Sequence, residues 1–112
     1  MKKIEAIIRE EKLKDVRMAL ESAGFPSITV IDVKGRGAQG GLSLQWRVGE
    51  YRVDLLPKKM IMVVVADEDC DKVIDTICDY GSSGNAGDGK IFVTTVDEVI
   101  RVRTRETGLQ AM

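Results

Sequence analysis

The sequence contains no histidine. Histidine is the commonest general base at neutral pH and the commonest metal ligand in proteins. Its absence excludes histidine-based catalytic triads, histidine general bases and most transition-metal sites. An enzyme is not excluded, but it would have to work without its commonest catalytic tools.

Aromatic residues and net positive charge are also scarce. Aromatics make up 4% of the chain, and the formal net charge is −1 at pH 7. Nucleic-acid binding usually requires a basic face, and single-stranded ligands also require aromatic rings for stacking. We therefore expect no nucleic-acid partner.

Long hydrophobic runs are absent as well. No apolar stretch approaches the length of a membrane span. The first residues, MKKIEAIIREEK, carry charges where a signal peptide has its apolar core. We therefore expect no direct membrane insertion and a cytoplasmic location.

The chain has only two cysteines, Cys70 and Cys78, which fall on one predicted helix. At a rise of about 1.5 Å per residue they lie about 12 Å apart, too far for a disulfide. We expect both to be small buried thiols.

What the chain does have is a strand–helix–strand pattern that occurs twice. Alternating or β-branched apolar residues indicate strands, and helical spacing of apolar residues indicates helices. The predicted elements are strands at 3–9, 27–33, 60–66 and 90–96 and helices at 11–24 and 67–81. Two tandem βαβ units predict a single α+β domain over residues 1–112, a ferredoxin-like sandwich with an antiparallel sheet and both helices on one face.

The predicted strand MIMVVVA, residues 60–66, is apolar on both of its faces. Such a strand is expected to be covered on both sides. A chain of 112 residues has no third layer to offer, so we expect an oligomer, with a closed ring as the natural way to hide these faces.

Residues 36–57 form a connection between the two repeats that is longer than the about 12–15 residues usual in compact domains. Connections of this length are usually functional or disordered. Two stretches within it, SLQWRV and EYRVDL, could pair across Gly49 as a hairpin. The segment is therefore predicted to be a hairpin arm that projects to contact a partner.

The stretch GNAGDGKI, Gly84 to Ile91, matches the Walker A pattern G-x-x-x-x-G-K-[ST] except that Ile91 replaces the hydroxyl residue. A P-loop connects a strand to a following helix, whereas this stretch connects a predicted helix to a following strand. The stretch is therefore not a Walker A loop. Its glycines could still let backbone N–H groups converge on an anion, with Lys90 adding a charge. The alternative is a flexible turn.

Two further segments favour an anionic ligand. Arg101 and Arg103 in VIRVRT are predicted to lie two apart on a strand, with both guanidinium groups on one face. The alternative is a solvated edge strand with acidic neighbours. The stretch KGRGAQGG, residues 34–41, is also rich in glycine. Three such segments in one short domain indicate a polyphosphate ligand.

The stretch SGNAGDGKIFVTTV, residues 83–96, fits every specified position of the pattern [ST]-x-x-x-G-[DY]-G-[KR]-[IV]-[FW]. This is the C-terminal signature of the PII family of nitrogen-regulatory signal proteins, and the chain resembles that family from end to end. MKKIEAII, LPK and VIRVRT also stand at family positions. GRGAQGG and SGNAGDGKIF are similar to the subgroup associated with nitrogenase in methanogens and some anaerobes.

The resemblance implies a homotrimer that binds ATP or ADP in the three clefts between neighbouring subunits. It identifies residues 36–57 as the T-loop, 82–90 as a phosphate loop and 101–112 as a C-terminal segment. The implied nucleotide-binding residues are Thr29, Gly35, Arg36, Gly37, Ala38, Gln39, Val64, Gly87, Asp88, Gly89, Lys90, Arg101 and Arg103.

The resemblance also implies an effector, 2-oxoglutarate, bound by Gln39, Lys58 and Gly87. It would join through Mg²⁺ on ATP, with Gln39 helping to coordinate the metal. The T-loop would dock on a target protein: nitrogenase, an ammonium transporter or glutamine synthetase. Tyr51 stands where some bacterial members are modified.

Three positions depart from the family pattern. Ala38 and Gly40 replace an arginine and a lysine, and Asn85 replaces a basic residue. These losses leave open a related sensor of another metabolite. A third possibility is a small ATP-hydrolysing enzyme, which the missing histidine and Walker hydroxyl disfavour. The expectation is a regulator and not an enzyme.

Overall fold

The computed structural model describes residues 1–37, 42–46, 49–53 and 55–112, and of 42–46 and 49–53 it describes the backbone. The elements in chain order are β1 (Lys2–Arg9), η1 (Glu10–Lys12), α1 (Leu13–Ser22), β2 (Thr29–Gly35), β3 (Leu42–Trp46), β4 (Gly49–Val53), β5 (Leu56–Val65), η2 (Asp67–Asp69), α2 (Cys70–Gly81), β6 (Lys90–Thr95) and η3 (Gly108–Ala111).

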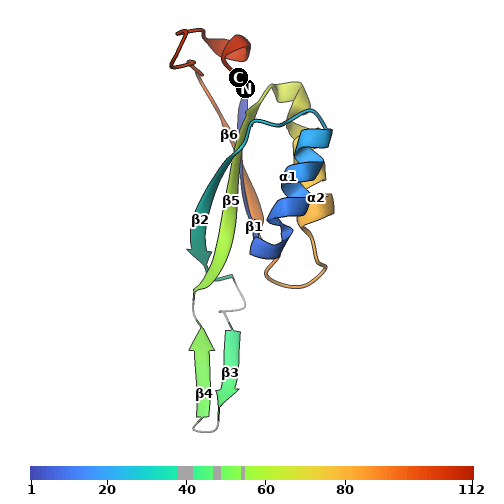
Figure 1. Cartoon of the computed structure of the whole chain (residues 1–112), viewed down its shortest axis with the longest axis vertical. Helices are drawn as coiled ribbons and strands as arrows, with labels where there is room; N and C mark the ends of the chain where they lie inside the picture. Colours follow the sequence, from blue (N-terminus) through green and yellow to red (C-terminus); the bar gives the residue numbers. More distant parts are fainter. Residues whose placement is uncertain (38–41, 47–48, 54) are drawn as a thin grey trace.

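Four strands form an antiparallel sheet in the order β2-β5-β1-β6, and β3 and β4 form a separate pair. Both helices pack on one face of the sheet (Figure 1). This order and the one-sided helices are those of a double βαβ sandwich. The α+β, ferredoxin-like fold expected from the sequence is confirmed.

The hydrophobic core lies between the sheet and the two helices. β1 and β5 each bury alternate residues, because successive side chains of a strand point to opposite faces. The buried side chains are Ile4, Ala6 and Ile8 of β1, Ile61, Val63 and Val65 of β5, Val16 and Leu20 of α1, and Cys70, Val73 and Ile77 of α2.

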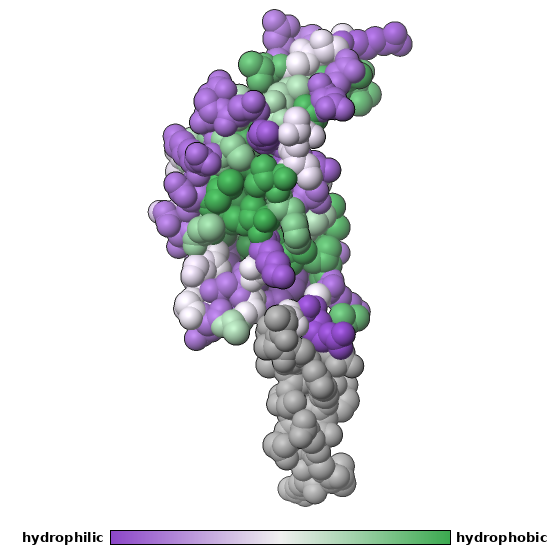
Figure 2. Space-filling view, turned by 180° about the vertical axis from the view of Figure 1, so that it is seen from behind, coloured by the Kyte–Doolittle hydropathy of each residue, from purple (hydrophilic) through white to green (hydrophobic). Residues whose placement is uncertain are grey.

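No helix in the described part of the chain covers the opposite face of the sheet, here called the open face (Figure 1). Met60, Met62 and Val64 of β5 alternate with the buried residues and therefore point to this face. Phe92 of β6 shares the face and is 50% exposed. Figure 2 shows hydrophobic side chains gathered in a patch on the globular part of the chain. The oligomer expected from strand 60–66 stays a prediction.

β3 and β4 form the expected hairpin, which projects from one end of the sheet (Figure 1). The last pair of the ladder is Trp46 with Gly49. Gly49 therefore begins β4, whereas the sequence suggested that the strands pair across it.

The prediction that Arg101 and Arg103 lie on a strand was wrong. The ladder between β1 and β6 ends at the pair of Lys2 with Thr95, before the chain reaches these arginines. The segment instead closes on itself, with a bridge between Ile100 and Thr107. The two arginines lie in the turn between these residues and do not share one face of a strand.

Both cysteines are free, as expected. Cys70 is buried in the core, but Cys78 is exposed, so the expectation of a buried thiol was wrong for Cys78. Among the described residues, none of the helices has the length and apolar character needed to cross a membrane.

Candidate functional site

The glycine-rich loop runs from the end of α2 at Gly81 to the start of β6 at Lys90. Three of its glycines have positive φ angles: 83° at Gly84, 94° at Gly87 and 104° at Gly89. Residues with a side chain rarely adopt positive φ angles, so the path of the loop depends on glycine. A network of side-chain contacts also holds the loop.

Gly89 is required for a second reason. A Cβ atom at this position would lie 1.7 Å from the carbonyl oxygen of Ile7. The loop therefore approaches the backbone of β1 so closely that only glycine fits. In contrast, a Cβ atom at Gly84 would meet nothing within 4 Å.

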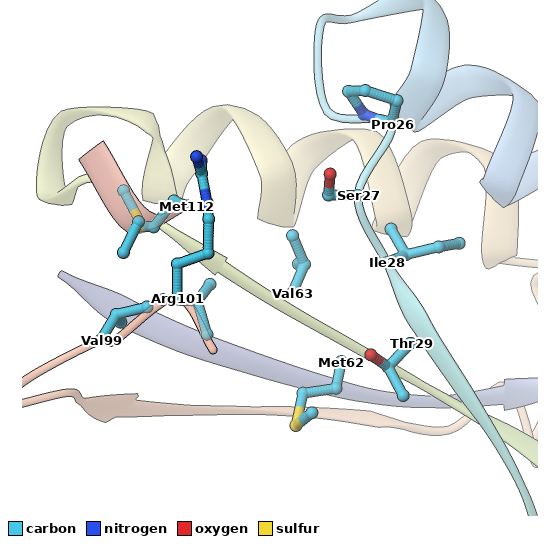
Figure 3. A pocket seen from close by; sticks show the side chains of 11 residues that line it. Pro26, Ser27, Ile28, Thr29, Met62, Val63, Val99, Arg101 and Met112 are labelled. Atoms are coloured by element: carbon cyan, nitrogen blue, oxygen red, sulfur yellow. The ribbon is translucent and has the colours of Figure 1, made fainter. Parts of the chain in front are cut away.

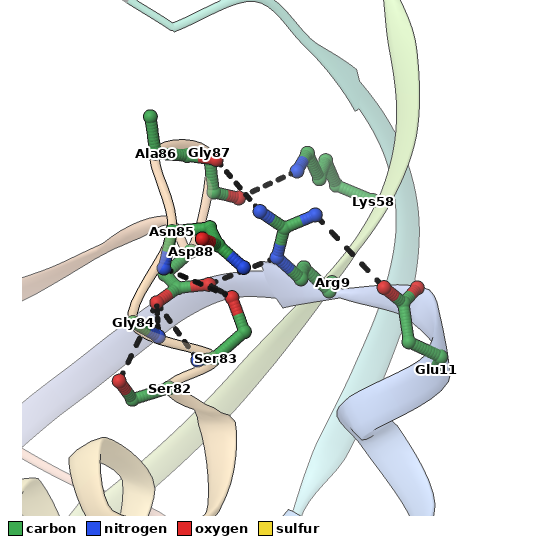
Figure 4. Close-up of polar contacts among 10 residues, drawn as sticks. All are labelled: Arg9, Glu11, Lys58, Ser82, Ser83, Gly84, Asn85, Ala86, Gly87 and Asp88. Carbon is green, nitrogen blue, oxygen red and sulfur yellow. Dashed lines mark hydrogen bonds and ion pairs between the residues drawn. The ribbon is translucent and has the colours of Figure 1, made fainter.

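The carboxylate of Asp88 lies at the centre of the loop (Figure 4). It accepts hydrogen bonds from the backbone N–H of Ser83 at 2.8 Å and of Gly84 at 3.0 Å, and from the Ser83 hydroxyl at 2.5 Å. Arg9 Nε donates to the same carboxylate at 2.9 Å. The Arg9 guanidinium, the Ser83 donors and the Gly84 N–H hold the pKa of Asp88 well below its ordinary value.

Two cations from the sheet also contact the loop backbone (Figure 4). Arg9 Nη2 donates to the carbonyl oxygen of Ala86 at 2.6 Å, and Lys58 Nζ donates to that of Gly87 at 2.7 Å. Lys58 and Gly87, both expected at the effector site, are therefore in contact. Gly35, at the end of β2, adjoins the Lys58 side chain.

A pocket of about 570 Å³ lies at the other end of the sheet (Figure 3). Its walls include Thr29, where β2 begins, Val64 of β5, and Met112 at the C-terminus. Arg101 also lines it, with its Nη1 3.2 Å from Glu106 Oε1 and its Nη2 donating to the carbonyl oxygen of Gln110 at 3.0 Å. The acidic neighbour proposed as the alternative for Arg101 is thus present.

The expected nucleotide residues fall into two groups on one chain. Gly87, Asp88, Gly89 and Lys90 belong to the glycine-rich loop or adjoin it, with Gly35 nearby. Thr29, Val64 and Arg101 line the pocket. We call these two groups the loop half-site and the pocket half-site.

The remaining expected residues lie elsewhere in the sequence. Arg36 and Gly37 follow β2 at the base of the arm, and Arg103 is exposed in the turn after Arg101. Ala38 and Gln39 lie outside the described residues, as does the side chain of Tyr51 in β4.

Sequence reasoning missed Arg9 and Ser83. Arg9 ends a strand whose alternation gives no hint of a loop 79 residues away. The only available signal was the glycine spacing, which indicates close backbone approach but not the partner. Ser83 could have been suspected because short hydroxyl side chains often bond to nearby turn residues.

The fold and the two half-sites define a ferredoxin-like domain with a glycine-rich loop, a pocket and a projecting hairpin. The family model described as nitrogen regulatory protein P-II matches residues 1–106. "Nitrogen regulatory protein P-II 2" of Methanothermobacter thermautotrophicus is 53% identical over 112 residues, all of this chain and 97% of that protein. "Nitrogen regulatory protein P-II" of Rhizobium meliloti is 52% identical over the full length of both.

A further relative bears on the subgroup. "Nitrogen fixation nifHD region GlnB-like protein 1" of Methanothermobacter marburgensis is 49% identical over 109 residues, which are 97% of this chain and all of that protein. The chain belongs to the P-II family of nitrogen regulatory proteins. The expectation of a nitrogen-regulatory signal protein, and not an enzyme, is confirmed by this membership.

Proposed function

We propose that the protein is a homotrimeric cytoplasmic sensor that binds ATP or ADP between neighbouring subunits. The observation that carries the proposal is the separation of the half-sites on one chain. Lys58, which contacts the loop half-site, and Val64, which lines the pocket half-site, stand at opposite ends of a regular stretch of β5. Six residues of strand span about 20 Å. One nucleotide can contact both halves more readily if they come from two subunits.

The open face of the sheet supports the trimer. It carries Met60, Met62, Val64 and Phe92 without a covering layer from the described part of the chain. Exposed apolar patches of this kind usually mark interfaces. A ring of three subunits would bury the three open faces and bring the loop half-site of one subunit to the pocket half-site of the next.

The pocket half-site fits an adenine ring. Its volume lies within the about 300–1,000 Å³ typical of small-molecule sites. Thr29 pairs with Met62, so β5 continues past the start of β2 to Val65, with no described strand on that side. A strand edge presents backbone N–H and C=O groups, which can recognise the polar edge of a purine.

The loop half-site fits the phosphates. Gly87 and Gly89 have the positive φ angles of an anion-binding nest, and Lys90 adds a cation at the end of the loop. Arg101 and Arg103 of the neighbouring subunit would complete the set. No cluster of three metal-ligating side chains occurs in the described part of the chain. Mg²⁺ would therefore be held largely by the phosphates, as is common for this ion.

Arg103→Ala should weaken ATP binding by about 1.5–3 kcal/mol, the range for a charge-assisted hydrogen bond. Arg103 is exposed, so the melting temperature of the ligand-free protein should stay nearly unchanged. Calorimetric titration with ATP measures the first quantity and thermal unfolding the second. Arg17→Ala, which removes an exposed arginine of α1, is the matched control and should leave both unchanged. A fallen melting temperature with normal ATP affinity would make Arg103 structural.

We further propose that 2-oxoglutarate is the effector, with Lys58 taking one carboxylate and Gln39 reaching the Mg²⁺ on ATP. The contact between Lys58 and Gly87 supports this, because it places an ammonium group beside the glycine-rich loop and the base of the arm. The arm would then transmit the signal to a target of nitrogen metabolism. Nitrogenase is favoured over an ammonium transporter or glutamine synthetase by the relative named for the nifHD region.

Gln39→Ala should abolish the effect of 2-oxoglutarate while ADP still binds. Trp46, the only tryptophan, lies on the arm, so its fluorescence should change when 2-oxoglutarate is added to the Mg-ATP form. A ligand shifts the arm only by its differential affinity for two shapes, and the Gln39 contact would supply that difference. Gln45→Ala on the same arm is the control. An effector response that survives Gln39→Ala would show that another contact switches the arm.

A sensor of a different metabolite is the second candidate. Ala38 and Gly40 lack the cations that the family pattern places there, and this weakens the case for a dicarboxylate. Titration with 2-oxoglutarate in the presence and absence of Mg-ATP separates the two functions. Binding that requires Mg-ATP supports our proposal, and no binding under either condition supports the second candidate.

A further inference from the structure

The register of the sheet places two cations directly side by side. Arg9 of β1 pairs with Lys58 of β5, so both side chains leave the same face at neighbouring positions. Like charges directly opposite each other destabilise a sheet. Here the glycine-rich loop lies over the pair and supplies the compensating groups, namely the Asp88 carboxylate and two backbone carbonyl oxygens.

The two cations fix the direction of two successive peptide groups. Arg9 holds the carbonyl of Ala86, and Lys58 holds the carbonyl of Gly87. In a trans peptide the N–H points opposite to the C=O. The N–H groups of Gly87 and Asp88 therefore both point away from the cations. Successive N–H groups on one side of the backbone, next to a glycine with positive φ, form an anion-binding nest.

We propose that Arg9 and Asp88 are positioning residues that hold the glycine-rich loop in its anion-binding shape. Asp88 fastens the first half of the loop through the N–H groups of Ser83 and Gly84, and Arg9 ties that carboxylate and the Ala86 carbonyl to β1. This inference rests on the proposed function, in which the loop binds the phosphates of a nucleotide.

Arg9 acts through the loop and not as a ligand of the phosphates. Its Nε and Nη2 are both used by the loop, and its charge lies against the Asp88 carboxylate at 2.9 Å. The third nitrogen, Nη1, faces Glu11 at 3.9 Å. The contact with Arg9 requires an ionised Asp88 carboxylate, and the lowered pKa of Asp88 keeps that carboxylate ionised at more acidic pH than an ordinary aspartate.

The direction in which Asp88→Asn changes the ATP affinity separates this proposal from a purely electrostatic effect. A carboxylate close to a polyphosphate repels it, so Asp88→Asn should tighten ATP binding if the shape of the loop did not depend on Asp88. If Asp88 positions the loop, the same substitution weakens binding, because the lost shape outweighs the removed repulsion.

The experiment compares Asp88→Asn, Arg9→Gln and the double variant with the wild-type protein, and Glu11→Gln is the matched control. Glu11→Gln removes the distant, exposed partner of Arg9 and should change nothing. Each of the other single variants should weaken ATP binding by about tenfold or more, as losses of outer-shell partners do. The double variant should bind ATP with the same affinity as the single variant that binds it less tightly, because both substitutions disturb the same loop. Adenosine, which lacks phosphates, should bind all variants equally.

A second measurement reads the loop without nucleotide. In the ligand-free protein, the ¹⁵N–¹H nuclear Overhauser effects of Gly84, Gly87 and Gly89 should show an ordered loop in the wild type and the control. They should fall in the Asp88 and Arg9 variants. A general loss of structure would lower the adenosine affinity as well, so the combination of the two readouts isolates positioning.

The outcomes are distinct. A loop that stays ordered in Asp88→Asn, an unchanged or higher ATP affinity, or additive effects in the double variant would each overturn the inference. Tripolyphosphate serves as the second probe. The wild-type protein could bind tripolyphosphate but not ATP, with the Asp88 and Arg9 variants binding tripolyphosphate more weakly than the wild type and the control. In that case the nucleotide proposal fails while the positioning role stands. If the wild-type protein binds neither, both fail.

Discussion

Gly89→Ala is expected to lower the free energy of unfolding by about 2–5 kcal/mol and to remove ATP binding. Two costs combine: a left-handed backbone at a residue with a side chain, about 1–2 kcal/mol, and an overpacked contact, about 1–3 kcal/mol. The φ angle of 104° imposes the first, and the 1.7 Å approach to the Ile7 carbonyl oxygen imposes the second. The loop can relieve the clash only by moving away from β1, which breaks the contacts of Asp88 with Arg9.

Gly84→Ala is the matched control for this substitution. Its φ angle of 83° is also positive, but a Cβ atom there meets nothing within 4 Å. We expect a loss of only about 1–2 kcal/mol, from backbone strain alone. Denaturant unfolding measures both variants, and calorimetry measures their ATP affinity. If the two variants were equally stable, the close approach at Gly89 would be of no energetic importance.

Met60→Glu is expected to convert the proposed trimer into single chains. Met60 points to the open face on a central strand and pairs with Ile7 of β1. In a ring built on the open faces, three carboxylates would be buried without partners, at several kcal/mol each. Sedimentation velocity should therefore show a species of 12.3 kDa in place of the trimer. Nucleotide affinity should fall with it, because each chain would keep only separate half-sites.

Met18→Glu is the control for the open face. Met18 lies on α1 and is 53% exposed, but the helix sits on the opposite side of the sheet. The same change of methionine to glutamate should leave the trimer intact. A trimer that tolerates Met60→Glu would show that the subunits meet through some other surface.

The fold could be predicted from local patterns because they agree with the sheet. Alternation in β1 identifies its buried residues, and helical spacing places Val16 and Leu20 toward the sheet. These signals depend only on the repeat of a strand or a helix. The same reasoning failed for Arg101 and Arg103, because the ladder between β1 and β6 ends at Thr95 and the segment with the arginines closes on itself instead.

The candidate site was predictable only in part. The glycines of residues 82–90 indicated a tight loop and an anion, and the family signature supplied the residue assignments. The ion pair between Arg9 and Asp88 was not predictable, because it joins residues 79 positions apart and depends on the register of β1. The division into two half-sites likewise follows from the direction of β5, which no local pattern reveals.

Native mass spectrometry with ATP tests the central claim most directly, because it counts chains and nucleotides in the same particle. We predict an assembly of three 12.3 kDa chains that gains up to three ATP molecules, with no single chain that carries ATP. Each nucleotide then requires the loop half-site of one subunit and the pocket half-site of another. A single chain that binds ATP, or a trimer whose mass ATP does not change, would contradict the account.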